Sequence, residues 1–132
     1  MNGVAAAAGL QMALTCDMLL ATQNSSFSTP GVKWGLFCST PGVQLIRSIN
    51  SEKKAKEMLL YGEPISAAEA YQYGLVNKVV EKEQLQAEID GYIERAQHLS
   101  GEVIALGKQT YEQQATDPDL KQAYCVAIKS MH

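Results

Sequence analysis

The chain opens with a run of small residues, Asn2-Gly3-Val4-Ala5-Ala6-Ala7-Ala8-Gly9, which leads into Leu10-Gln11-Met12-Ala13-Leu14-Thr15-Cys16-Asp17. Leu10, Ala13 and Leu14 recur at helical spacing, so the stretch predicts a tight turn entering a helix at residues 6–15. Small side chains let the backbone come close to a ligand, and the first N–H groups of a helix have no intrahelical acceptor. The turn therefore predicts backbone binding of an acyl oxygen or another anion. Simple close packing of the turn on a sheet is the alternative.

Composition limits the possible functions. The chain has 132 residues, 46% of them hydrophobic, which suits one domain or part of a larger one. Its 11 basic and 14 acidic residues give a net charge of −3 and form no basic stripe, which argues against a nucleic-acid partner. The sequence contains no run of 18 apolar residues, so it predicts no membrane span. The three cysteines, Cys16, Cys38 and Cys125, lack the spacing of a metal site or of a disulfide framework.

The first half of the chain predicts short elements separated by turns. Residues 18–21 form an apolar run typical of a buried strand, and Phe27 and Ser28 predict a second short strand before Thr29-Pro30-Gly31. Residues 31–42 are rich in glycine and proline and predict a loop, with Trp34, Leu36 and Phe37 as its apolar anchors. The strand that feeds the first helix is expected to precede Met1.

The second half predicts mainly helices. Ser51 is a candidate N-cap for a helix that ends near Leu60, with Gly62 beyond it. Ser66-Ala67-Ala68-Glu69 matches a capping box, and its short helix is expected to close at Gly74. The remaining predictions are a strand at 75–80, helices at 83–99 and 100–115, a break at Asp117-Pro118, and a last helix with an apolar stripe from Leu120 to Met131.

Several of these stretches, taken in order, resemble the crotonase superfamily of enoyl-CoA hydratases and isomerases. The matching segments are Asn2-Gly3-Val4-Ala5 with Gly9, Ala13–Asp17, Ser26–Pro30, Gly35–Gly42, Gly62–Ala67 and Glu69–Val80. The resemblance implies an α/β fold, the ββα spiral shared by ClpP and the crotonases. Residues 1–80 would form the C-terminal part of that core. Residues 81–132 would begin a helical trimerisation region that is incomplete.

The resemblance also implies a site. Family members hold a thioester oxygen between two backbone N–H groups; one of them matches Ala8, and the other would lie before Met1. Substrate-binding positions match Ala7, Gly9, Pro30, Gly31, Phe37 and Cys38. The two glutamates that hydratases use to activate water match Gln11 and Gly31, so no catalytic side chain is intact. Neither a neutral amide nor a glycine can exchange protons at neutral pH. General acid–base catalysis typically raises the reaction rate 10²–10⁴-fold.

The function expected from the resemblance is acyl-CoA binding in fatty-acid metabolism, with weak or absent hydratase activity. The alternatives are a non-enzymatic assembly or regulatory partner of other crotonases and a truncated isoform. The resemblance implies no metal and no cofactor, since acyl-CoA serves as substrate or ligand. It further implies a homo-oligomer, a trimer or hexamer, if the protein is complete, and a mitochondrial location, although no transit peptide is visible.

Overall fold

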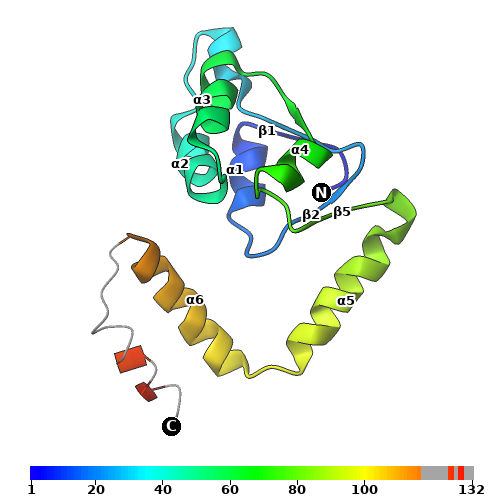
Figure 1. Ribbon diagram of the computed structural model, residues 1–132, viewed down its shortest axis with the longest axis vertical. Helices are drawn as coiled ribbons and strands as arrows, with labels where there is room; N and C mark the ends of the chain where they lie inside the picture. The colour runs from blue at the N-terminus through cyan, green and yellow to red at the C-terminus, as the bar shows by residue number, and fades with distance from the viewer. Residues whose placement is uncertain (117–124, 127, 130–132) are drawn as a thin grey trace. The chain divides into compact units, whose positions relative to one another are not determined.

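The computed structural model describes residues 1–116, 125–126 and 128–129, and it divides the chain into two compact units, Met1–Ile89 and Asp90–His132. Figure 1 follows the chain from the blue N-terminal strand and helix to the yellow and orange helices. Each unit is described by itself. The first contains the strands and the buried core, and it therefore carries the candidate site.

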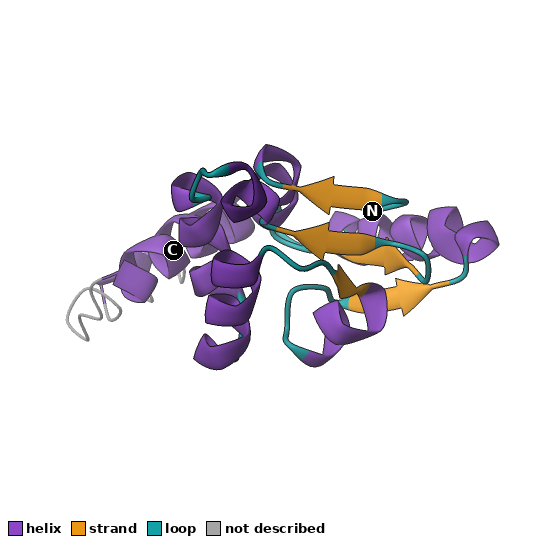
Figure 2. Cartoon of the chain, turned by 90° about the horizontal axis from the view of Figure 1, so that it is seen from above, coloured by secondary structure: helices purple, strands orange, loops and turns teal. Residues whose placement is uncertain are grey.

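Two small sheets form the centre of the first unit (Figure 2). In one, β1 (Val4–Ala6) runs parallel to β3 (Ser26–Ser28), and β4 (Ile65–Ser66) pairs antiparallel with β3. In the other, β2 (Leu20–Thr22) runs parallel to β5 (Lys78–Val80). The strands at 18–21 and 75–80 were thus predicted in the right places but with different bounds.

One prediction about the opening stretch is wrong. The strand that feeds the first helix does not precede Met1, because β1 lies within the small-residue run itself. The chain passes from β1 through Ala7 directly into α1 (Ala8–Leu14). Leu10, Ala13 and Leu14 are buried as the helical spacing predicts. The alanine and valine residues of β1 form a strand because they pair with β3. Strand propensity reflects the local sequence, so it gives no signal for this pairing.

Two helices of the first unit start at the residues predicted to cap them. The Ser51 hydroxyl accepts a hydrogen bond from the Lys54 amide at the start of α3 (Glu52–Tyr61), and Gly62 ends this helix with a positive φ of 70°. Ser66 and Glu69 form both hydrogen bonds of the capping box that starts α4 (Ala67–Gln72). The other helical segments of the unit are η1 (Pro30–Trp34), α2 (Ser39–Ser48), η2 (Lys82–Gln84) and the first residues of α5 (Leu85–Gln97).

The apolar anchors predicted for the loop at 31–42 are wrong. Trp34, Leu36 and Phe37 are 80%, 71% and 55% exposed, whereas Cys38 is buried. The loop also contains η1 and the first turns of α2. Gly35, with a φ of 76°, ends η1 within this loop. The core consists instead of residues from the strands and helices, the largest being Phe27, Leu10, Leu45 and Met58.

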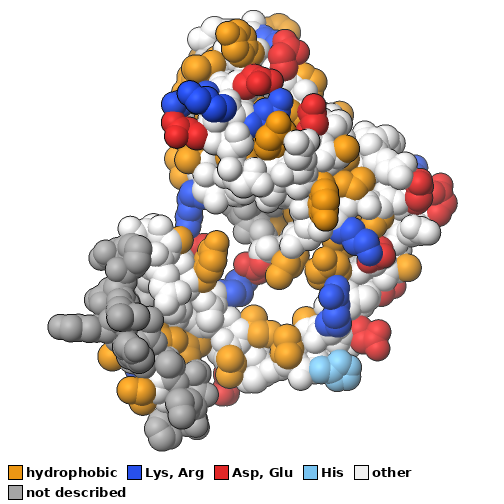
Figure 3. Space-filling model, in the orientation of Figure 1, with side chains coloured by type: hydrophobic (Ala, Val, Ile, Leu, Met, Phe, Trp, Pro, Cys, Tyr) orange, Lys and Arg blue, Asp and Glu red, His pale blue; other side chains and the backbone are white. Residues whose placement is uncertain are grey.

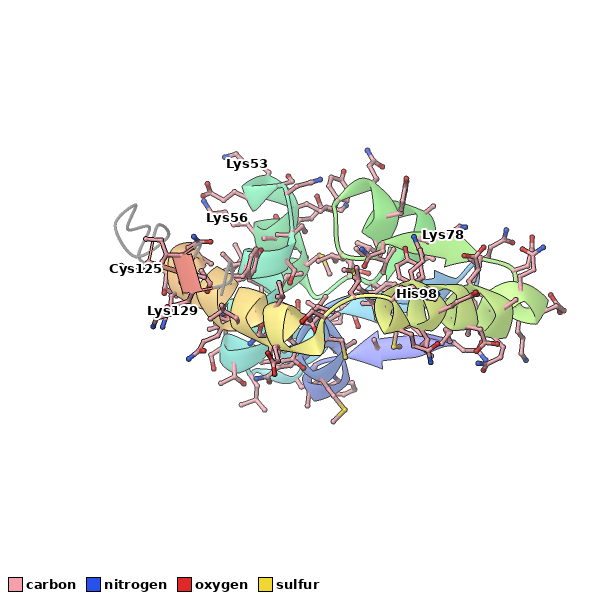
Figure 4. The ribbon with its side chains drawn as sticks, turned by 90° about the horizontal axis from the view of Figure 1, so that it is seen from below. Lys53, Lys56, Lys78, His98, Cys125 and Lys129 are labelled. Carbon is pink, nitrogen blue, oxygen red and sulfur yellow. The ribbon has the colours of Figure 1, made fainter. Side chains whose placement is uncertain are left out.

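The second unit is helical where it is described. It contains the later residues of α5 and α6 (Gly101–Thr116), whose start is capped by the Ser100 hydroxyl 3.4 Å from the Val103 amide. His98 is exposed just after α5 (Figure 4). The predicted break at Asp117-Pro118 and most of the apolar stripe after it lie outside the described residues. None of the described helices is long and apolar enough to cross a membrane.

Candidate functional site

The candidate site forms where β1 and β3 end side by side. These strands are parallel and in register, with Ala6 opposite Ser28, so the segments that follow them leave the sheet at the same edge. The Ala7 amide donates to the Ser28 carbonyl at 3.0 Å and joins the two exits. Of the predicted site residues, Ala7, Ala8 and Gly9 follow β1, and Pro30 and Gly31 follow β3. The fold thus brings together two segments that the sequence separates by about twenty residues.

Ala7 has a backbone conformation that alanine rarely adopts. Its φ of 49° and ψ of −117° make it the one non-glycine residue with positive φ among the described residues. These angles are those of the first central position of a type II′ turn, where glycine dominates. The conformation reverses the chain between β1 and α1, which leaves the Ala8 and Gly9 amides at the first turn of the helix. Sequence reasoning missed this feature, because four consecutive alanines give no signal for positive φ.

The first amides of α1 are available to a ligand. Ala8 and Gly9 are both exposed, and as the first residues of the helix they have no intrahelical acceptor for their N–H groups. Gln11 is the first residue whose amide bonds within this turn, to the Ala7 carbonyl at 3.0 Å. Backbone donors of this kind can stabilise negative charge on an acyl oxygen without any side chain.

The two segments that leave the sheet at the site contain no side chain that could transfer a proton. Residues 7–11 and 29–31 contain no ionisable side chain. Gln11, which is half-buried, lies one turn after Ala8 on the same face of α1. Lys33 of η1 is paired with Glu63 at 2.9 Å. The described residues hold no group of three His, Cys, Asp or Glu side chains that could bind a metal ion.

Cys38 lies against a residue of the site, whereas Phe37 is a largely exposed neighbour of Cys38. The turn after η1 brings the Cys38 thiol against Gly31, and Cys38 is buried at the start of α2. Phe37, the preceding residue, is exposed. Thr29, which the sequence did not single out, is fully buried, and its hydroxyl donates to the Met58 carbonyl at 2.9 Å. This contact joins residues 29 positions apart, so a threonine before Pro-Gly in the sequence could not indicate it.

One hollow of the surface lies away from these residues. It is an open depression of about 730 Å³ lined by residues of α4 and β5 and by their neighbours, namely Gln23, Ala68, Tyr71, Asn77, Lys78 and Val79. None of the predicted site residues lines it. Lys78 is paired there with Glu88 at 2.7 Å and projects beside α5 (Figure 4). We assign the candidate site to the β1–β3 edge, because the free amides lie there and not in the hollow.

The surface of the first unit mixes apolar and charged side chains. On the face shown in Figure 3, hydrophobic groups alternate with lysines and carboxylates over the α2 and α3 region. Lys53 and Lys56 project outward from α3 (Figure 4). Lys56 is paired with Glu52, which lowers the pKa of the Glu52 carboxyl through their hydrogen bond and opposite charges. An exposed ion pair of this kind contributes little to stability.

Comparison with known proteins gives a consistent result. The model of the enoyl-CoA hydratase/isomerase family matches residues 1–131. The mouse mitochondrial protein named enoyl-CoA hydratase domain-containing protein 3 is 50% identical over 130 residues, which are 98% of this chain and 43% of the relative.

Solved structures agree with the fold. The crystal structure of human enoyl-CoA hydratase domain-containing protein 3 matches with a TM-score of 0.87 and 47% identity, over 98% of this chain and 50% of that chain. An enoyl-CoA hydratase from Mycobacterium smegmatis matches with a TM-score of 0.90 and 39% identity, over 99% of this chain and 50% of that chain. The chain therefore has the crotonase fold and spans about half the length of the proteins it matches.

Proposed function

Because the chain belongs to the enoyl-CoA hydratase/isomerase family, we propose that it binds the acyl group of a coenzyme A thioester at the Ala7–Gly9 turn. In this proposal the Ala8 amide donates to the thioester oxygen. The proposal places the protein in fatty-acid metabolism, with weak or absent hydratase activity. Its closely similar relatives are named mitochondrial, and we propose that location for this protein too.

The observation that carries the proposal is the backbone of the turn. Ala7, with its positive φ, separates β1 from α1, and the exposed residues Ala8 and Gly9 that follow have no intrahelical acceptors for their amides. A thioester carbonyl is a neutral acceptor whose oxygen becomes more negative when the acyl group is activated. Fixed N–H donors therefore suit it better than a charged side chain, which would attract any anion.

Weak hydration follows from the side chains that are present. Adding water to an enoyl thioester requires a group that takes a proton from water and one that returns a proton to carbon. Gln11 and Gly31 stand where the family resemblance assigns those two groups, and neither can do this. Acyl binding without efficient hydration is the expected result.

Two variants of Ala8 test the binding proposal. Ala8→Pro removes the N–H at the first helical position, where proline is otherwise tolerated, and Ala8→Gly keeps the N–H. We expect butyryl-CoA, measured by calorimetry, to bind Ala8→Pro about 2- to 10-fold more weakly than wild type, the equivalent of one neutral hydrogen bond. Ala8→Gly should bind like wild type. Circular dichroism must show that both variants are folded, because proline also restricts Ala7.

Two results contradict the proposal. Equal butyryl-CoA affinity for folded Ala8→Pro and Ala8→Gly would exclude the Ala8 amide as the donor. Turnover of crotonyl-CoA at the rate of ordinary hydratases would contradict the loss of acid–base catalysis.

A second candidate function has its own observation. In α5 no residue is buried, and apolar side chains of the second unit, including Ile93, Val103 and Tyr111, are about half or more exposed. Apolar helix faces of this kind favour association with other chains. We therefore propose that residues 81–132 act as a region of self-assembly or of assembly with other crotonases. Light scattering of the chain alone and mixed with a full-length homologue tests this, and a monomer that does not mix would contradict it.

A further inference from the structure

Gly31 has no room for a side chain. A Cβ atom built on it would lie 2.5 Å from the Leu36 carbonyl oxygen and 2.9 Å from the Cys38 Sγ. Both separations are shorter than real Cβ contacts, so the neighbours would have to move. The nearer neighbour is backbone, which cannot rotate away as a flexible side chain can. Because every residue type except glycine has a Cβ atom, position 31 excludes all of them.

The turn that creates this contact is closed by its own hydrogen bonds. The Leu36 amide donates to the Gly31 carbonyl at 2.9 Å, and the Gly35 amide donates to the Val32 carbonyl at 3.2 Å. Gly35 reverses the chain with a φ of 76°. Opening the turn to admit a side chain would break these bonds and would expose the buried Cys38.

The other side of the segment is fixed as well. The Thr29 hydroxyl donates to the carbonyl of Met58, a buried residue in the last turn of α3. Pro30 Cα and Val32 Cγ2 each lie 3.1 Å from the place where a Cβ on Gly62 would stand, so η1 packs tightly on the end of α3. Residue 31 can therefore move neither toward α2 nor toward α3 without loss of packing.

We infer that the Thr29–Cys38 turn keeps position 31 free of any side chain, so that restoring the two missing carboxylates does not restore hydration. The inference rests on the proposed function where it treats position 31 as the place of a catalytic carboxylate. It goes beyond that function because the backbone around position 31 excludes a carboxylate, whatever the identity of residues 11 and 31. The site is then one for binding the thioester, with the turn backbone filling the space of a proton-transfer group.

Thermal melting of alanine variants tests the packing claim without any ligand. Gly31→Ala should lower the melting temperature by at least about 4 °C, the usual effect of overpacking in a domain of this size. Gly9→Ala is the matched control, because a Cβ there meets nothing within 4 Å and alanine favours the helix. We expect no loss for Gly9→Ala. Equal melting temperatures for Gly31→Ala and wild type would overturn the inference.

A double variant identifies the obstructing group. Cys38→Ala removes the thiol but leaves the Leu36 carbonyl, so Gly31→Ala/Cys38→Ala should keep most of the loss relative to Cys38→Ala alone. Full recovery in the double variant would show that the thiol, not the backbone, fills the space, and it would overturn the claim that every side chain is excluded.

The activity arm uses Gln11→Glu and Gln11→Glu/Gly31→Glu with crotonyl-CoA. We expect no gain in hydration from either variant and a lower melting temperature for the second. A double variant that melts like Gln11→Glu and hydrates crotonyl-CoA would overturn the inference. If wild type fails to bind acyl-CoA, the proposed function fails, whereas the melting comparison at Gly31 still decides the packing claim.

Discussion

At the scale of single residues, Ala7 is strained at the turn where we propose that the thioester binds. Its φ of 49° and ψ of −117° lie outside the region that alanine normally occupies. Such a conformation costs on the order of 1–3 kcal/mol and persists only where the surroundings fix it. Here the bond from the Ala7 amide to the Ser28 carbonyl and the start of α1 fix it from both sides.

Ala7→Gly should therefore stabilise the protein. Relief of the strain exceeds the entropic cost of glycine, so we expect the free energy of unfolding to rise by about 1 kcal/mol. Urea denaturation followed by circular dichroism measures it. Ala8→Gly, one residue later in the helix, should instead be neutral or destabilising. A loss of stability in Ala7→Gly equal to that in Ala8→Gly would show that position 7 is not strained.

The site residues show what sequence can predict at this scale. Small residues before a helical pattern predicted backbone donors at this turn, and the family resemblance assigned one of them to Ala8; both Ala8 and Gly9 are exposed residues. The positive φ of Ala7 and the closed space at Gly31 could not be predicted. Both depend on contacts with Ser28, Leu36 and Cys38, which the chain makes only after the sheet and the turn have formed.

At the scale of elements, local capping signals predicted the helices well. Ser51, Gly62 and the Ser66–Glu69 box lie where the structure starts and ends helices, because caps depend on residues within one turn. The strand β1 and the exposure of Trp34 depend on distant partners, so the sequence pattern gave the wrong prediction for both. Apolar character alone does not tell whether a side chain is buried.

The capping box of α4 gives a prediction at this scale. Ser66→Ala removes the acceptor of the Glu69 amide, 3.1 Å away, and should lower the free energy of unfolding by about 1 kcal/mol. Ser66→Asp keeps an acceptor and should retain most of the stability. Chemical denaturation of both variants checks this. Equal losses in the two variants would mean that the cap hydrogen bond does not stabilise α4.

At the scale of the whole molecule, the crotonase fold follows from motifs spread over the chain and from solved structures of the same fold. The fold alone does not determine activity. We propose that the Ala8 amide serves as a backbone donor and that Gln11 and Gly31 occupy the acid–base positions of the family. Acyl binding without efficient hydration is therefore the central claim.

The N-terminus makes the stability of the 132-residue chain depend on pH. The Met1 amino group donates to the Leu20 carbonyl, and partial burial lowers its pKa from 8.0, with a smaller opposing effect of Cys16. Between the lowered pKa and about pH 8.0 the unfolded chain binds more protons at this group, so stability should rise with pH across that window. Thermal melting at several pH values measures it. Nα-acetylation should remove this dependence; an unchanged slope would assign it to other groups.

The central claim is tested most directly by an ¹⁵N–¹H NMR titration of the chain with butyryl-CoA, followed at the Ala8 amide. Our account predicts that the Ala8 resonance shifts progressively and saturates, with Gly9 shifting beside it and coenzyme A alone producing a smaller change at Ala8. Saturating butyryl-CoA that leaves the Ala8 and Gly9 amides unmoved would contradict the account.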